Sequence, residues 1–158
     1  MKDFLLPEEG PYSASSYIVS KENYILAVSR KDNQKDFGLP GGKLDPGENF
    51  LDACIRETME ETGLNIWKAV PIFGDKCGLP ERDIVHWNMV FLCYATGQIN
   101  TREKGKVIWT KPYRLIKDVD GNDCRFSQFN QRLFDYFKSK DIKPFLSDVT
   151  ILEKEIEL

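Results

Sequence analysis

Hydrophobic and polar residues alternate most regularly between Ile84 and Ala95, and this pattern predicts a β-strand with two distinct faces. Shorter apolar runs predict further strands at 67–73 and 107–109. Two more β-prone runs, 15–19 and 24–28, are joined by four polar residues, which is typical of a β-hairpin. Together these runs predict a sheet of several strands.

Two segments repeat apolar residues at helical spacing. The first runs to Thr62, with Asn49 as its predicted N-cap and Gly63 as its C-terminal stop. The second covers 127–138, with Ser127 as its predicted N-cap, and we expect it to cover the sheet face opposite the first helix.

The remaining segments are predicted less sharply. Glycine and proline interrupt 74–83, so we expect a loop that folds over a site. Residues 113–116 suit a helical turn, and 97–106 is polar. The last stretch, 145–158, fits either a strand or a mobile tail.

Charged residues cluster on the first predicted helix. Glu57, Glu60 and Glu61 are three and four residues apart and therefore share one helix face, where each like-charge pair costs about 0.2–0.5 kcal/mol. Arg56 can offset part of this repulsion by a bidentate pair with Glu48, which would pin the preceding turn to the helix. The remaining charge favours a divalent cation, and hard oxygen ligands favour magnesium, with manganese as the alternative. The competing interpretation, a solvated acidic helix face, is disfavoured by the loop glycines and Arg56 at fixed offsets.

The segment 42–64 resembles the signature of the Nudix hydrolases, G-x5-E-x7-R-E-U-x-E-E-x-G-U, where U is a bulky aliphatic residue. One position departs from it, because Thr58 stands where an aliphatic residue is usual; its methyl group can still pack on the sheet. The resemblance implies an α/β fold of the Nudix type, an α/β/α sandwich with a mixed sheet between helices. It also implies a magnesium-dependent hydrolase acting on a nucleoside diphosphate linked to another group. The matching positions are Gly42, Glu48, Arg56, Glu57, Glu60, Glu61, Gly63 and Leu64.

The resemblance assigns roles to these residues. Glu57, Glu60 and Glu61 would hold the metal together with the backbone carbonyl of Gly42. The general base would be Glu60 or Glu61 itself, or an acidic residue from the loop before the Val107-Ile108-Trp109 strand. Glu103 is the best candidate in that loop.

Further residues are predicted to bind substrate from their chemistry alone. Arg30 and Lys43 flank or enter the glycine-rich loop and carry the charge that phosphate groups need, although either can be an ordinary surface cation. Phe37, Trp87 and His86 can stack on or border a nucleobase, with core packing as the alternative for Trp87.

Composition limits the setting and the partners. A chain of 158 residues, 41% hydrophobic and 30% charged, predicts one globular domain over 1–158. The net charge of −3 and the absence of a basic stripe argue against a nucleic-acid polymer and leave a small nucleotide as the expected partner. No apolar run suits a membrane span, no signal-peptide pattern opens the chain, and the four cysteines lack a CxxC pair. We therefore expect a cytoplasmic protein with reduced, mostly buried thiols, either a monomer or a homodimer.

The substrate is predicted from two short features. The loop 39–43 resembles that of the MutT-type branch, which converts nucleoside triphosphates to monophosphates. Pro80 lies sixteen positions past Leu64, where the ADP-ribose branch tends to carry a proline. We favour a triphosphate, with an ADP-ribose or nucleotide-sugar pyrophosphatase as the alternative. A catalytically silent nucleotide-binding module and a calcium-binding domain are disfavoured by the intact motif and by carboxylates placed on a helix.

Overall fold

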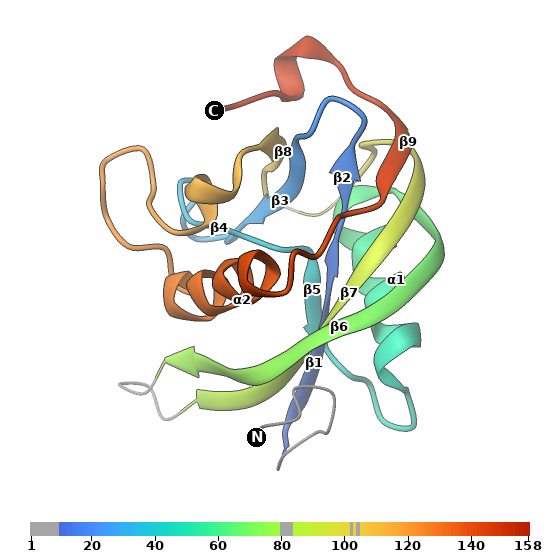
Figure 1. Ribbon diagram of the computed structural model, residues 1–158, viewed down its shortest axis with the longest axis vertical. Helices are drawn as coiled ribbons and strands as arrows, with labels where there is room; N and C mark the ends of the chain where they lie inside the picture. The colour runs from blue at the N-terminus through green and yellow to red at the C-terminus, as the bar shows by residue number, and fades with distance from the viewer. Residues whose placement is uncertain (1–9, 80–83, 102, 104) are drawn as a thin grey trace.

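The computed structural model describes residues 10–79, 84–101, 103 and 105–158. Five strands precede the first helix, three lie between the two helices, and one follows the second (Figure 1). In chain order they are β1 (Tyr12–Tyr17), β2 (Val19–Ser20), β3 (Ile25–Ser29), β4 (Phe37–Gly38), β5 (Gly41–Lys43), α1 (Phe50–Thr62), β6 (Asn65–Leu79), β7 (Ile84–Gln98), β8 (Val107–Thr110), a 3₁₀ turn (Pro112–Leu115), α2 (Ser127–Ser139), β9 (Leu146–Thr150) and a second 3₁₀ turn (Glu153–Glu155).

The described strands form one curled, mixed sheet. Its main path runs β4-β3-β2-β9-β7-β1-β5, while β6 pairs with β7 and β8 pairs with β3. The pairs β1/β7, β2/β9 and β7/β9 are parallel, and the others are antiparallel. The predicted strand at 84–95 is the long strand β7, which has partners on both sides and organises the sheet.

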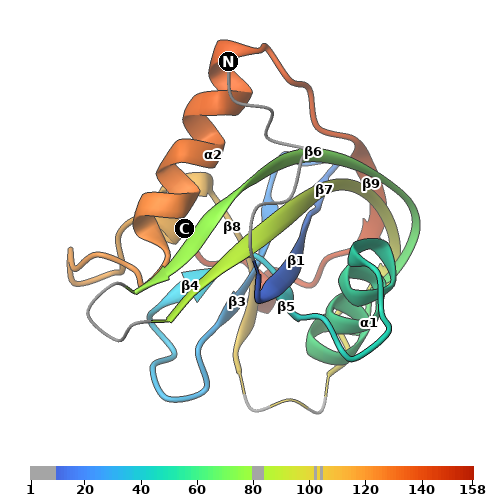
Figure 2. The same ribbon diagram turned by 90° about the horizontal axis from the view of Figure 1, so that it is seen from below.

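The sheet lies between the two helices, as Figure 2 shows, which confirms the predicted α/β sandwich. Alternation along β7 divides the core in two, because successive side chains point to opposite faces. Trp87, Met89, Phe91 and Cys93 pack with Ala53 and Cys54 on the α1 side. On the α2 side the core is formed by Val90 and Leu92 together with Phe129, Leu133 and Phe137 of that helix.

Helix α1 is capped as its sequence predicts. Asn49 has an extended backbone, and its side chain accepts a hydrogen bond of 2.8 Å from the Asp52 amide. At the other end Gly63 adopts a left-handed conformation with φ of 81°, and its N–H group donates to the Met59 carbonyl. A Cβ atom there would collide with the backbone oxygen of Asn100, so glycine is required for both reasons.

The expected hairpin between 15–19 and 24–28 forms only in its inner part. Val19 of β2 pairs with Ile25 of β3, but β1 leaves the hairpin and joins β5 and β7 instead. β1 ends at Tyr17 and β2 begins at Val19. The two strands therefore have different partners and belong to different parts of the curled sheet.

Three further expectations need correction or completion. The predicted loop 74–83 is wrong for 74–79, which continue β6 along β7; only 80–83, with Pro80, lie outside the described residues. Glycine and Pro71 did not end the strand, because β6 pairs on one side only and carries register shifts near Pro71. Ser127 is the first residue of α2 and not its cap, since Phe126 holds that position without a side-chain hydrogen bond. The first part of the 145–158 stretch is strand β9.

Both helices contain 13 residues, and the described part of the chain has no helix suited in length and apolarity to spanning a membrane. The four cysteines are free and buried, which confirms the expectation of buried thiols.

Candidate active site

Arg56 is the centre of an ion-pair network that joins the glycine-rich loop to α1. Its Nε and Nη2 atoms donate to the two carboxylate oxygens of Glu48 at 2.8 and 2.9 Å, which confirms the predicted bidentate pair. Nη1 reaches Glu57 at 2.9 Å and Glu60 at 3.2 Å, and Nη2 also donates to the Lys43 carbonyl at 3.1 Å. The guanidinium group thus holds the turn and two of the three helical carboxylates in one place. Its ion pair lowers the pKa of Glu48 to about 2, so this carboxylate stays charged.

Glu57 lies against the glycine-rich loop. A Cβ atom at Gly42 would stand 2.5 Å from Glu57 Oε1, so the position admits only glycine while that carboxylate keeps its place. Partial burial raises the pKa of Glu57, and the nearby Arg56 opposes this effect. The backbone of Gly42 and the Glu57 carboxylate are therefore neighbours, as binding of one metal ion by both would require.

Glu61 lines a large pocket of about 540 Å³. Its Oε1 atom accepts a hydrogen bond of 2.7 Å from the Gly41 amide. Burial raises the pKa of Glu61 to about 8, and the neighbouring charges of Glu57 and Glu103 add to this effect while the Gly41 bond opposes it. Of the three carboxylates on the motif helix, Glu61 is the one that lines this pocket.

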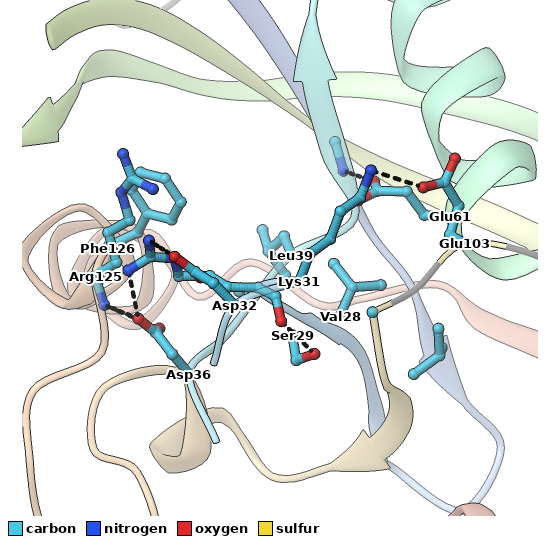
Figure 3. Close-up of a pocket in the computed structure, with 15 residues that line it drawn as sticks. Val28, Ser29, Lys31, Asp32, Asp36, Leu39, Glu61, Glu103, Arg125 and Phe126 are labelled. Carbon is cyan, nitrogen blue, oxygen red and sulfur yellow. Dashed lines mark hydrogen bonds and ion pairs between the residues drawn. The ribbon is translucent and has the colours of Figure 1, made fainter. Parts of the chain in front are cut away.

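Glu103 lines the same pocket as Glu61, although 42 residues separate them in the sequence. Its Oε2 atom forms an ion pair of 3.1 Å with Lys31 Nζ (Figure 3). Because the loop before β8 lies beside the C-terminal part of α1, Thr101 also donates to the Glu60 carbonyl at 3.1 Å. The structure therefore brings Glu103 to the site where the sequence placed it.

The opposite wall of the pocket carries cations and an aromatic ring. Arg30 pairs with Asp32 at 2.9 Å and with Asp36 at 3.7 Å. Asp36 is buried and also accepts from the Arg125 amide at 3.0 and 3.1 Å, so it connects this loop to the start of α2 (Figure 3). The sequence analysis had no signal for Arg125 and its neighbour Phe126, because they reach the pocket only through tertiary folding.

The structure places the other predicted binding residues differently. Phe37 and Trp87 are 2% and 1% exposed and belong to the two cores, so the prediction that they border a nucleobase is wrong. Their aromatic rings fill the sheet faces because alternation buries them there. Lys43 and His86 line a second, smaller pocket, and Arg30 is the one of the two predicted phosphate-binding cations that lines the larger pocket.

The donors present suit magnesium in kind. Three carboxylates and the Gly42 carbonyl are hard oxygen ligands, the type that magnesium and manganese take. Among the described residues no three acidic, histidine or cysteine side chains already converge as ligands. Arg56 engages Glu57 and Glu60, while the Gly41 amide engages Glu61. Glu57, Glu60, Glu61 and Gly42 are thus the residues that would hold the metal.

The site thus combines a helix that carries clustered carboxylates with a glycine-rich loop, on a mixed sheet between two helices. Residues 11–127 match the family model of the NUDIX domain. The chain belongs to the Nudix family.

Individual relatives share parts of the chain. A protein from Bacillus subtilis, described provisionally as an 8-oxo-dGTP diphosphatase, is 41% identical over 56 residues, 34% of this chain and 37% of that protein. An ADP-ribose pyrophosphatase from Methanocaldococcus jannaschii is 45% identical over 56 residues, 34% of this chain and 33% of that protein. The matched part thus spans about a third of these curated relatives. A solved Nudix hydrolase from Nitrosomonas europaea shares the fold with a TM-score of 0.68 and 16% identity, covering 87% of this chain and 94% of that one.

Proposed function

We propose that this chain is a magnesium-dependent pyrophosphohydrolase that cleaves a phosphoanhydride of a nucleoside diphosphate linked to another group. The substrate that we favour is a nucleoside or deoxynucleoside triphosphate, converted to the monophosphate and pyrophosphate. One observation carries this proposal: carboxylates and cations line a single pocket. Glu61 and Glu103 supply the carboxylates, and Arg30 and Lys31 supply the cations.

Each group has a role in this reaction. When bound, magnesium would neutralise charge on the phosphates and make water more acidic. Arg30 and Lys31 would hold the phosphate oxygens by charge-assisted hydrogen bonds. Arg56 fixes the geometry by tying the turn at Glu48 to the helix. A water oxygen attacks phosphorus, the anhydride P–O bond breaks, and a carboxylate accepts the water proton.

Three carboxylates are candidates for the general base. Glu60 is 48% exposed, pairs with Arg56 and does not line the large pocket, so its position suits metal binding. Glu61 and Glu103 both line the pocket. We favour Glu103, because it comes from a separate loop and its carboxylate pairs with the exposed Lys31, which a phosphate group can draw away.

The relatives support two substrate classes. The Bacillus subtilis protein, whose name refers to a deoxynucleoside triphosphate, supports our preference. The name of the Methanocaldococcus jannaschii protein supports ADP-ribose as the second candidate. Both substrates contain the diphosphate that the pocket would grip, and they differ in the group beyond it.

A substrate panel tests the proposal. The purified chain is incubated with magnesium and nucleoside triphosphates, ADP-ribose, nucleotide sugars or dinucleoside polyphosphates, and the products are separated by chromatography. We expect pyrophosphate and a monophosphate from triphosphates, and reaction in ¹⁸O-labelled water identifies the phosphorus that is attacked. The Glu61→Gln variant is the control for contaminating activity. If no member of the panel is hydrolysed above this control, the silent nucleotide-binding alternative is favoured instead.

A further inference from the structure

A cleft rich in cationic side chains adjoins the large pocket at the start of α2. Its volume of about 600 Å³ lies within the roughly 300–1,000 Å³ of ligand pockets. Four cations line this basic cleft against two carboxylates, although the whole chain has a net charge of −3. The cations are Arg30, Lys76, Arg125 and Arg132, and the carboxylates are Asp36 and Asp123.

Both carboxylates of the basic cleft already have partners. Asp36 accepts from the Arg125 amide at 3.0 and 3.1 Å and lies 3.7 Å from Arg30. Asp123 pairs with Lys117, which does not line the cleft. The cleft therefore keeps an excess of positive charge, which an anionic ligand would offset.

Arg132 is held at the wall of the cleft by two hydrogen bonds. Its Nε atom donates to the buried Asp75 at 2.9 Å, and its Nη2 atom donates to the Lys76 carbonyl at 2.8 Å. The guanidinium group is thus tied to β6, although α2 carries it. A guanidinium group that is already fixed loses less side-chain entropy when it binds a phosphate.

Arg125 has a hydrogen-bond donor without a partner. Its Nε atom is buried and meets no acceptor among the described residues. The guanidinium group lies 5.4 Å from the centre of the Phe126 ring (Figure 3). A buried donor that lacks an acceptor costs free energy, and a phosphate oxygen is an acceptor well matched to arginine.

The first turn of α2 adds an attraction of the same sign. Phe126 holds the N-cap position without a side-chain hydrogen bond, and the first turn contains no acidic residue. Ser127 and Gln128 of this turn line the cleft. The N-terminus of a helix carries a partial positive charge and unpaired N–H groups, so it strengthens a site that the four cations define.

We infer that the basic cleft binds a phosphate group other than those of the anhydride that is cleaved. This phosphate is either a free anion or a further group on the substrate, such as a 3′-phosphate, and both sources present the same oxygen atoms. The large pocket differs in charge, because three cations and four carboxylates line it. The inference concerns a site beyond that of the proposed hydrolysis and does not require the chain to hydrolyse nucleotides.

The first test locates the binding of inorganic phosphate by NMR. The ¹⁵N-labelled protein is titrated with sodium phosphate without magnesium, at constant ionic strength. We expect saturable shifts of the Gln128 and Phe129 amides with a dissociation constant of about 1 mM, the affinity that a few charge-assisted hydrogen bonds provide. Shifts confined to the Gly41 and Gly42 amides would place the phosphate in the glycine-rich loop and count against the basic cleft.

Reversal of one charge tests whether the cleft cations hold the phosphate. Lys76 is exposed on β6 and lines the cleft but not the large pocket, so Lys76→Glu should fold and weaken phosphate binding at least about tenfold. Lys31→Glu is the matched control, because Lys31 is an exposed cation that lines only the large pocket. If Lys76→Glu does not fold, Gln128→Glu replaces it, since a helix tolerates a carboxylate in its first turn. Equal losses in the cleft variant and in the control would indicate unspecific attraction and overturn the site.

A matched pair of nucleotides distinguishes the two sources of the phosphate. The value of kcat/KM is measured for adenosine 3′-phosphate 5′-triphosphate and for ATP at fixed magnesium. If the substrate supplies the phosphate, the 3′-phosphate should raise kcat/KM at least about tenfold, and Lys76→Glu should lose this gain while hydrolysing ATP as the wild type does. No gain, together with saturable binding of inorganic phosphate, identifies the free anion. No gain and no binding of inorganic phosphate would overturn the inference.

Failure of the proposed function would be recognised separately. If neither nucleotide is hydrolysed, the same pair is compared by calorimetric titration in the presence of magnesium. Tighter binding of the 3′-phosphorylated nucleotide by the wild type, but not by Lys76→Glu, would still support the basic cleft. Equal affinities in both proteins, without phosphate-dependent shifts in the NMR titration, would refute it.

Discussion

Thr58 occupies the position of the Nudix motif where an aliphatic residue is usual, and the structure shows what its hydroxyl does. The hydroxyl lies 2.8 Å from the hydroxyl of Ser16 on β1, and both residues are fully buried. A hydroxyl without a partner in this core would cost about 1–3 kcal/mol, so each residue explains the presence of the other. The pair joins the motif helix to the central part of the sheet.

Substitution of one partner should therefore harm the protein more than substitution of both. Thr58→Val keeps the side-chain shape but removes the partner of the Ser16 hydroxyl, and Ser16→Ala removes the Ser16 partner of the Thr58 hydroxyl. We expect each change to lower the free energy of unfolding by about 1–3 kcal/mol, or roughly 2–4 °C in Tm for each kcal/mol. The double variant should cost much less than the sum, with a coupling free energy of about 1–2 kcal/mol.

Urea denaturation followed by circular dichroism measures these values for the wild type and the three variants. Thr62→Val is the comparison for Ser16→Ala, since Thr62 donates to the Thr58 carbonyl and not to the hydroxyl pair. The loss of unfolding free energy caused by Thr62→Val should add to the loss caused by Ser16→Ala. Additive effects for Thr58→Val and Ser16→Ala, within about 0.5 kcal/mol, would refute the reasoning.

Three other predictions follow from the site. Glu103→Gln should fold normally and lower kcat by about 10²–10⁴-fold if Glu103 accepts the water proton, as steady-state pyrophosphate release will show. Glu48 has a pKa lowered to about 2 by Arg56, so its contribution to stability is complete above its unfolded value of 4.5 and is lost as pH falls toward 2. Acid unfolding should therefore be less steep in Glu48→Gln between these pH values. Gly63→Ala should lower the free energy of unfolding by at least about 1–2 kcal/mol, measured by urea denaturation, because of its left-handed backbone.

Each of these has an outcome that contradicts it. Wild-type kcat in Glu103→Gln would remove Glu103 from the general-base role and return the choice to Glu60 or Glu61. Identical acid unfolding of wild type and Glu48→Gln would mean that the Arg56 pair also persists in the unfolded chain. For Gly63→Ala, Gly47→Ala is the control: its φ is 79°, but a Cβ atom there meets nothing within 4 Å, so it should be the milder change. Equal effects would show that the contact with Asn100 contributes nothing.

Local chemistry explains why part of the fold was predictable. The cap at Asn49, the stop at Gly63 and the two faces of β7 depend on residues close together in the chain. The bidentate pair of Arg56 and Glu48 is similar, because two residues only eight apart, one in a turn and one in the helix that follows it, can meet in few ways. For these features, spacing along the sequence nearly determines spacing in the structure.

Features that depend on distant partners were predicted poorly. Residues 74–79 look like a loop in isolation, yet β7 supplies a complete hydrogen-bonding partner and keeps them in β6. Phe37 and Trp87 have the side chains of a base-binding site, and only the packed sheet shows that both are interior. Arg125 and Phe126 gave no signal at all, since they reach the pocket only when the start of α2 packs beside the loop that holds Asp36.

The sequence by itself determined the family signature, the acidic face of the motif helix and the turn that Arg56 holds, because all of these lie within one continuous segment. The tertiary structure decided which residues line the two pockets, because β1, β7, α2 and the loop before β8 meet there only after the sheet has closed. Hydrogen bonds and burial act through space, so the polarity of a pocket is fixed when distant segments come together.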